Sequence, residues 1–230
     1  FLIPFLIFMA LGPQLNWIKS KLEGKLFLAI LFVISILISF LIIKNLGTEL
    51  LVNTILIGSA FYLFFITIRD LCFKKFKNIS QNISHLGFSL LILSILFNNI
   101  FSKEVITNLK VGEKFNNDKY EIFFKDLKKE EKKNYISFKG DFQIIEDNKN
   151  KDYLKPELRV YNQPNIVTSE ADIKTTFFTD KFITMNTVHN ENYFNIRYQV
   201  KPLMLWIWIS VLLISFGGIL SFLNKKNYEK

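Results

Sequence analysis

This sequence has little cysteine and histidine, and its long apolar runs contain no acidic residues. It contains one Cys and two His in 230 residues. The lone Cys72 can form neither an internal disulfide framework nor a Cys-x-x-Cys pair, so any thiol chemistry must belong to a partner. The absence of Asp and Glu from the apolar runs disfavours a proton relay through them.

Long apolar runs dominate the composition, which is 50% hydrophobic and includes 25 Phe. Leu26–Ile43 holds eighteen residues without a charge, and as a helix it would span about 27 Å, close to the thickness of a bilayer core. Leu50–Ile68, Ile83–Ile100 and Leu203–Leu223 are similar. The opening run, residues 1–13, is too short to span and has no initiator Met. We therefore expect it to be the truncated end of a helix in a C-terminal fragment, rather than a signal peptide.

The formal charge of +9 is unevenly distributed. Phe101–Val200 carries 15 Lys and two Arg against 16 acidic residues, so the excess lies in segments that flank the apolar runs. Two apolar runs separate each basic cluster from the next, which places all three on the cytoplasmic side by the positive-inside rule. The segment 101–200 is then extracytoplasmic, and this distribution of charge disfavours a nucleic-acid-binding surface. The clusters are Lys19, Lys21 and Lys25; Arg69, Lys74, Lys75 and Lys77; and Lys225, Lys226 and Lys230.

Residues 101–200 alternate charged with aromatic and β-branched residues, a pattern typical of half-buried strands. We expect six to nine strands in a sandwich or barrel, with "KDLKKEEKKN" as a solvated connection or a short charged helix. The predicted fold class is a polytopic α-helical membrane protein with an inserted extracytoplasmic all-β domain. Its parts are about four transmembrane helices in 1–100, the β-domain in 101–200, a final helix in 201–224 and a cytoplasmic tail in 225–230.

His85 lies near the start of an apolar run, where an ionisable side chain indicates a functional site. On a helix, Gln81, His85 and Ser89 share a face with Asn82 beside it, and Gly87 leaves room for a flat ligand or another backbone. His85 could hydrogen-bond a neighbouring helix, relay protons or ligate haem iron. The relay would need acidic partners, and bis-histidine ligation would need a second histidine from elsewhere.

Other polar or aromatic residues have simpler interpretations. His189, in "NTVHNENY", is expected in a solvent-exposed loop. Trp206 and Trp208 are expected to anchor the last helix at the membrane interface, and Gly217 and Gly218 to permit close helix approach. Small or weakly polar residues in the second and third helices are expected to serve helix packing: Ser35, Ser39, Asn53, Thr54, Gly58 and Ser59.

Several motifs occur in an order that resembles the C-terminal part of the CcmF/NrfE family of cytochrome c maturation proteins. The histidine helix "SHLGFSLLILS" and the closing helix "KPLMLWIWISVLLISFGG" are the more specific matches. "VGEKF", "NYISFKGDF", "LKPELRVY" and "SEADI" are looser matches in the β-domain. Ser169 and Asn224 depart from the family pattern. The Gly-Pro-x-Leu-x-Trp pattern is carried by Gly12, Pro13, Leu15 and Trp17.

The resemblance implies a b-type haem held between two transmembrane histidines, of which the second matches His85. It implies that haem arrives from a CcmE-type chaperone and is joined to the CxxCH thiols of apocytochrome c, which CcmH- or CcmI-type subunits deliver. The b-haem is implied to reduce the incoming haem iron, with quinol as one candidate source of the electrons. The family's chaperone-facing histidines and Trp-rich segment are expected upstream of Phe1, so they are not transferred to His189, Trp206 or Trp208.

The predicted function is therefore that of a System I cytochrome c haem lyase subunit, with His85 as an axial iron ligand and no catalytic residue in this chain. The fragment alone is expected to be inactive. The predicted location is the bacterial inner membrane with the β-domain in the periplasm, or alternatively the mitochondrial inner membrane. The alternatives are a transporter or permease subunit, for which broken helices in paired repeats are not seen, and a non-catalytic scaffold with a partner-docking β-domain.

Overall fold

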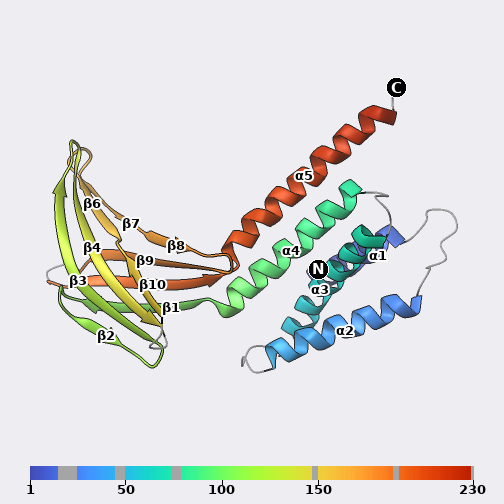
Figure 1. The fold of residues 1–230 in the computed structure, drawn as a ribbon, viewed down its shortest axis with the longest axis horizontal. Coiled ribbons are helices and arrows are strands. Elements are labelled where there is room, and N and C mark those ends of the chain that lie inside the picture. The colour runs from blue at the N-terminus through green and yellow to red at the C-terminus, as the bar shows by residue number, and fades with distance from the viewer. Residues whose placement is uncertain (15–24, 45–49, 74–78, 147–149, 189–191, 229–230) are drawn as a thin grey trace. The chain divides into compact units, whose positions relative to one another are not determined.

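The computed structural model describes residues 1–14, 25–44, 50–73, 79–146, 150–188 and 192–228. These form two compact units, one of Phe1–Ile100 with Leu203–Lys230 and one of Phe101–Pro202. The first unit is helical (Figure 1). Its elements are α1 (Leu2–Leu11), the 3-10 helix η1 (Gly12–Gln14), α2 (Lys25–Ile43), α3 (Leu50–Phe73), α4 (Ile79–Phe101) and α5 (Met204–Tyr228).

Four of the described helices are long and apolar enough to cross a membrane. They are helical without interruption because no helix-breaking proline lies inside them, and many of their large side chains are exposed, as expected for surfaces that face lipid. The predicted fold class, a polytopic helical membrane protein with an inserted all-β domain, is confirmed. The candidate spans are Leu26–Ile43, Leu51–Phe73, Ile79–Phe101 and Met204–Leu223.

Small residues let α2 and α3 pack closely. The Ser39 hydroxyl donates a hydrogen bond of 2.8 Å to the carbonyl of Thr54, which joins the two helices. Gly58 faces Ile36 of α2, and a Cβ at Gly58 would lie 3.2 Å from the Cα of Ile36. Polar side chains on these helices thus serve packing and backbone hydrogen bonding, as the sequence predicted.

The helix predicted to end at Ile68 continues to Phe73, which corrects one expectation about acidic residues. Asp70 lies inside α3 with 3% of its side chain exposed, so the helices do contain a buried acid. The prediction that they contain none was wrong because the apolar run stops before the helix does. The Arg69 Nε donates to Asp70 Oδ1 at 2.9 Å, and the Arg69 guanidinium also lies 5.6 Å from the ring centre of Phe27 on α2. Asp70 is therefore paired, and its charge is balanced next to the helix end.

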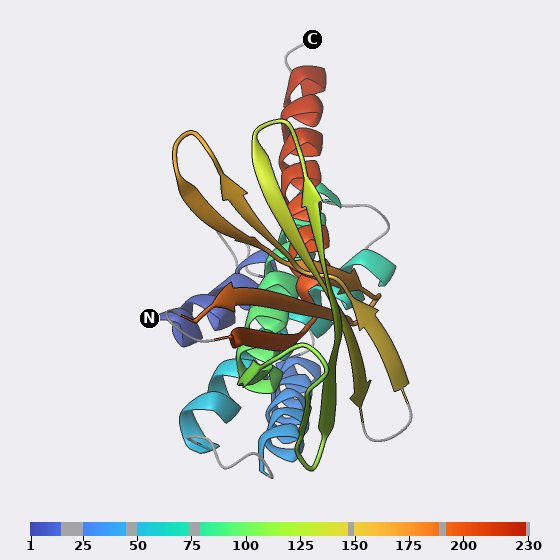
Figure 2. The ribbon, with the colours of Figure 1, turned by 90° about the vertical axis from the view of Figure 1, so that its left-hand side faces the viewer.

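The second unit contains two antiparallel sheets. One has the strand order β1-β10-β9-β8, and the other β2-β3-β4-β6-β7 with β5 also paired to β4. In Figure 2 the long β3–β4 hairpin crosses over the strands of the other sheet. The strands are β1 (Lys103–Leu109), β2 (Lys114–Asn116), β3 (Tyr120–Glu131), β4 (Tyr135–Glu146), β5 (Asn150–Leu154), β6 (Glu157–Tyr161), β7 (Ile166–Glu170), β8 (Asp172–Thr175), β9 (Thr179–Thr187) and β10 (Phe194–Pro202).

The core of this unit lies between the two sheets, where apolar side chains at alternate strand positions meet. The rings of Phe124 and Phe142 stack with centroids 4.3 Å apart. Gly140 leaves room for them, because a Cβ there would lie 2.5 Å from Cε2 of Phe142. The fully buried positions on β9 and β10 include Ile183, Met185, Ile196 and Tyr198.

The described residues form ten strands rather than the six to nine that were expected. Three of them, β2, β5 and β8, are only three to five residues long, too short to show a clear alternation in the sequence. "KDLKKEE" is also strand and not a connection or helix: it is the second half of β3, paired with β4 from Asp126↔Asp141 to Glu131↔Ile136. A register shift between Phe124 and Asp126 moves the alternation by one residue. The charged residues therefore lie on an exposed hairpin, where alternation alone does not distinguish strand from loop.

Candidate functional site

Helix α4 carries His85 and is buried along two of its sides. One side faces α5, and the other includes Asn82, Ser89 and Leu93, all of which are at most 5% exposed. His85 is six residues from Ile79, so it lies about 9 Å along the axis from the first residue of α4. At about 100° per residue, it points well away from the side that faces α5.

Two glycines bring α4 and α5 into close contact. A Cβ on Gly87 would lie 2.9 Å from the backbone nitrogen of Ile214 and the carbonyl oxygen of Ser210 on α5. A Cβ on Gly217 would lie 2.8 Å from the carbonyl oxygen of Ser80 on α4. The space left by Gly87 is therefore filled by another backbone, one of the two possibilities that the sequence allowed. Gly218 has nothing within 4 Å and does not take part in this contact.

The side of α4 nearer to His85 packs toward α1 and α3. Phe88, three residues after His85, makes an edge contact with Phe5 of α1 at 5.8 Å between ring centres. Leu93 belongs to a buried cluster with Leu6 of α1 and Ile57 of α3. Contacts on both sides of α4 therefore fix the rotation of the helix and the direction in which His85 points.

The imidazole of His85 has an unsatisfied polar atom. Its Nδ1 is buried and has no hydrogen-bond partner among the described residues. Ser89, one turn later, does not satisfy it, because its hydroxyl donates to the carbonyl of Leu86 at 2.9 Å. A buried polar atom without a partner costs about 1–3 kcal/mol, so the ring is expected to have a partner that these residues do not supply. This orphaned nitrogen is compatible with an imidazole that ligates a metal centre.

The structure also describes other residues that the sequence singled out. Gln81 is exposed, Asn82 is buried, and Trp208 on α5 is 66% exposed. The described residues contain no group of three or more His, Cys, Asp or Glu side chains that could hold a metal ion. His189 and Trp17 lie outside the described residues.

A cluster of charged side chains that no sequence pattern indicated joins the two sheets. Lys181 Nζ on β9 lies 2.7 Å from Glu146 Oε2 on β4 and 2.9 Å from Asp152 Oδ2 on β5. Lys174 Nζ on β8 lies 2.5 Å from Asp152 Oδ1. These partners are 22 to 35 residues apart in sequence, so no local pattern indicates them.

The charges in this cluster stabilise one another. Burial raises the pKa of Asp152, but hydrogen bonds from Lys174 and Lys181 outweigh it, so the pKa lies below its ordinary value. Burial lowers the pKa of Lys181, and hydrogen bonds to Glu146 and Asp152 outweigh that effect, so this pKa is raised. Burial also raises the pKa of the nearby Tyr198. The cluster has all its charges paired, which indicates that it holds the sheets together.

Comparisons with known proteins agree with this fold. Residues 100–202 match the family described as the CcmF C-terminal beta-sandwich. The cytochrome c-type biogenesis protein CcmF of Pseudomonas fluorescens is 29% identical over 146 residues, which cover 64% of this chain and 22% of that protein. The protein of the same name from Haemophilus influenzae is 25% identical over 240 aligned positions, covering 97% of this chain and 37% of that protein.

A solved structure of a protein named cytochrome c heme lyase CcmF has the same fold. It superposes with a TM-score of 0.70 at 17% sequence identity, over 94% of this chain and 38% of that chain. This chain thus spans less than two-fifths of the length of each of these relatives. The resemblance to the C-terminal part of CcmF proteins is confirmed: residues 100–202 match the CcmF C-terminal beta-sandwich family, and nearly the whole chain is similar to CcmF proteins in sequence and in fold.

Proposed function

We propose that this chain is part of a cytochrome c haem lyase, in which His85 is one axial ligand of a b-type haem in the membrane. Haem would reach the assembly from a CcmE-type chaperone and be joined through thioether bonds to the CxxCH thiols of apocytochrome c. CcmH- or CcmI-type subunits would deliver that substrate. The names of the relatives, which refer to cytochrome c biogenesis and to heme lyase, support this proposal.

The observation that carries the proposal is the orphaned Nδ1 of His85. The structural alternative, a hydrogen bond from His85 to a neighbouring helix, is not made by Nδ1 among the described residues. A neutral imidazole is a common iron ligand, and the hydrogen bond of its second nitrogen sets which nitrogen coordinates. The second axial ligand would come from outside the described residues, since the only other histidine of this sequence is His189.

The chain's own residues would hold and orient this group rather than perform the thioether chemistry. Gly87 and Gly217 let α5 contact α4 closely, and this contact fixes the direction of the His85 ring. Bound at His85, haem would supply one-electron redox chemistry. The only thiol, Cys72, is exposed near the end of α3 and has no second cysteine, so the thiols that form the thioethers would be those of the substrate.

The proposed topology places the start of α4, and with it His85, toward the cytoplasmic side and the β-domain in the periplasm. The basic clusters of the sequence support this orientation through the positive-inside rule. The β-domain would then lie on the side where c-type cytochromes are assembled. A mitochondrial inner membrane would give the equivalent arrangement.

The proposal is tested by c-type cytochrome assembly in cells that produce the protein at its full natural length with His85→Ala. The matched control is Gln81→Ala, one turn earlier on α4 and exposed. We expect His85→Ala to abolish covalent haem attachment, with normal protein levels in the membrane, while Gln81→Ala remains active. Unchanged assembly in His85→Ala would contradict the ligand role and favour a non-catalytic scaffold.

A further inference from the structure

One edge of the β-domain adjoins both connections to membrane-spanning helices. Strand β1 begins at Lys103, two residues after α4 ends at Phe101, and β10 ends at Pro202, two residues before α5 begins. In the sheet, Lys103 pairs with Val200 and Pro202 pairs with Thr179. The turn between β8 and β9, residues 176–178, is therefore at the same end of the strands, although β1 and β8 are the two outer strands of this sheet. We call this end of the sheet, formed by Lys103, Pro202 and residues 176–178, the junction edge.

The junction edge exposes two phenylalanines on a rigid turn. Phe177 and Phe178 are 54% and 61% exposed, and their rings meet edge to face at 4.9 Å. The Thr176 hydroxyl donates to the carbonyl of Thr179 at 2.7 Å, and the Thr179 amide donates back to that hydroxyl at 3.1 Å. Thr179, the residue after this turn, pairs with Pro202, which is two residues before α5 begins. Exposed aromatic side chains so near in the fold to the start of a membrane-spanning segment are typical of residues that enter the membrane interface.

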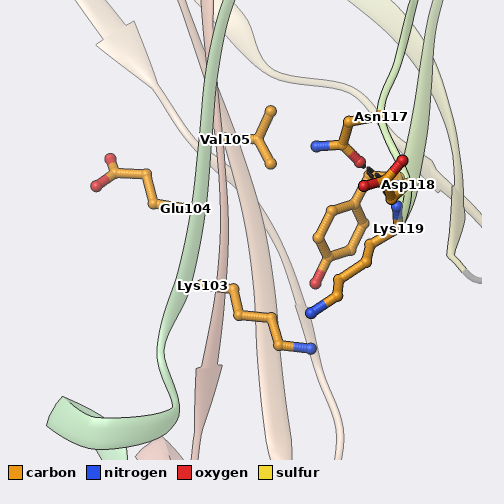
Figure 3. Close-up of a pocket in the computed structure, with 7 residues that line it drawn as sticks. Lys103, Glu104, Val105, Asn117, Asp118 and Lys119 are labelled. Carbon is orange, nitrogen blue, oxygen red and sulfur yellow. Dashed lines mark hydrogen bonds between the residues drawn. The ribbon is translucent and has the colours of Figure 1, made fainter. Parts of the chain in front are cut away.

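A cavity of about 400 Å³ lies at the same edge, between the start of β1 and the turn that joins β2 to β3. Figure 3 shows the side chains of Lys103 and Lys119 extending toward one another, so that their ammonium groups converge. Neither lysine forms an ion pair within the described part of the chain. Two like charges that converge without a counter-ion repel each other, and a bound anion would relieve that repulsion.

The acidic residues at the cavity do not neutralise both lysines. Glu104 accepts hydrogen bonds from Arg197 and from Gln199, the latter at 2.7 Å, and in Figure 3 its carboxylate points away from the two ammonium groups. Asp118 is the other acid that lines the cavity. Two ammonium groups therefore face one uncommitted carboxylate, which leaves the cavity with an excess of positive charge.

We propose that the junction edge is a lipid-binding surface, in which Lys103 and Lys119 bind the phosphate of an anionic phospholipid and Phe177 and Phe178 enter the interface beside it. The chain itself favours a lipid over a soluble anion. Lys103 is two residues beyond Phe101, so its Cα lies within about 7 Å of the Cα of Phe101. The headgroup layer extends about 5–7 Å beyond the hydrocarbon core, which is the range in which a lipid phosphate is found.

Native mass spectrometry of the intact protein in detergent, titrated with phosphatidylglycerol, tests the phosphate site. The double variant Lys103→Gln/Lys119→Gln is compared with Lys128→Gln/Lys133→Gln, which removes two exposed lysines from the β3–β4 hairpin. We expect the first pair to weaken lipid binding about thirtyfold and the second to leave it unchanged. Equal binding by both variants would overturn the proposal. Binding of inorganic phosphate alone as tightly as phosphatidylglycerol would also overturn it, in favour of a site for free anions.

Spin labelling in lipid nanodiscs tests the aromatic turn independently. In a Cys72→Ser background, a label at Phe178→Cys is compared with one at Asn134→Cys, in the exposed turn between β3 and β4. At position 178 we expect strong relaxation by oxygen and weak relaxation by a water-soluble nickel reagent, with the reverse at position 134. Water-like accessibility at both positions would contradict membrane entry by this turn.

Discussion

Lys181 makes the cluster between the sheets open to a quantitative test. Its ammonium group is shared by Glu146 and Asp152, and the three side chains are 15%, 20% and 9% exposed. Lys181→Met keeps most of the aliphatic stem but leaves both carboxylates without this partner. Breaking a fully buried pair costs about 3–5 kcal/mol, and breaking an exposed pair costs about 0–1 kcal/mol.

An intermediate cost follows from the contacts that would remain. Asp152 would keep Lys174 at 2.5 Å, and Glu146 would keep the Tyr120 hydroxyl at 3.4 Å. We therefore expect Lys181→Met to destabilise β9 and its neighbours β4 and β5 by about 2 kcal/mol, which corresponds to roughly thirtyfold faster amide exchange.

Hydrogen–deuterium exchange of the intact protein measures this effect strand by strand. The matched control is Lys129→Met, because Lys129 pairs with Glu131 at 3.0 Å while both side chains are more than half exposed. The control is expected to cost less than about 0.5 kcal/mol, which changes exchange little more than twofold. If Lys181→Met exchanged no faster than Lys129→Met, the cluster would not hold the sheets together and this reasoning would be refuted.

Two further predictions concern helix packing and pH. Gly87→Val should separate α4 from α5 and lower the free energy of unfolding by about 1–3 kcal/mol. Gly218→Val should have little effect, because a Cβ at Gly218 has nothing within 4 Å. Thermal melts of the two purified variants compare these effects. The stability from Asp152, whose pKa is lowered by folding, should be complete above pH about 4 and decline as the pH falls through the lower folded value. The stability contributed by Lys181, whose pKa is raised by folding, should be complete below pH about 10.4 and decline as the pH rises further. Lys181→Met should lose this alkaline decline, which a series of thermal melts over pH measures. An alkaline decline that persisted unchanged in Lys181→Met would contradict the assignment.

The helical part of the fold could be predicted because its signal is local. Each apolar run is long enough to identify a span, and His85 is conspicuous in one of them. The end of α3 could not be placed in the same way, because Arg69 and Asp70 end the apolar run while the helix continues to Phe73. Their pairing balances the two charges, so the helix can continue past the end of the apolar run.

Long-range contacts explain what the sequence could not show. Gly87 was recognised as a gap, but only the structure shows that α5 fills it and that His85 points elsewhere. The Lys181 cluster joins strands that are far apart in sequence, and the convergence of Lys103 and Lys119 depends on how β1 lies beside the β2–β3 turn. The second half of β3 was mistaken for a connection because its charged residues obscure the strand pattern.

The absorption spectrum of the purified protein at its full natural length tests the central claim most directly. With His85 intact, the dithionite-reduced sample should show the α band of a b-type haem, and His85→Ala should remove or shift this band. Added imidazole should restore it, because the free ligand can occupy the position of the missing ring. A reduced spectrum of His85→Ala that is identical to that of the unaltered protein would contradict the assignment of His85 as an iron ligand.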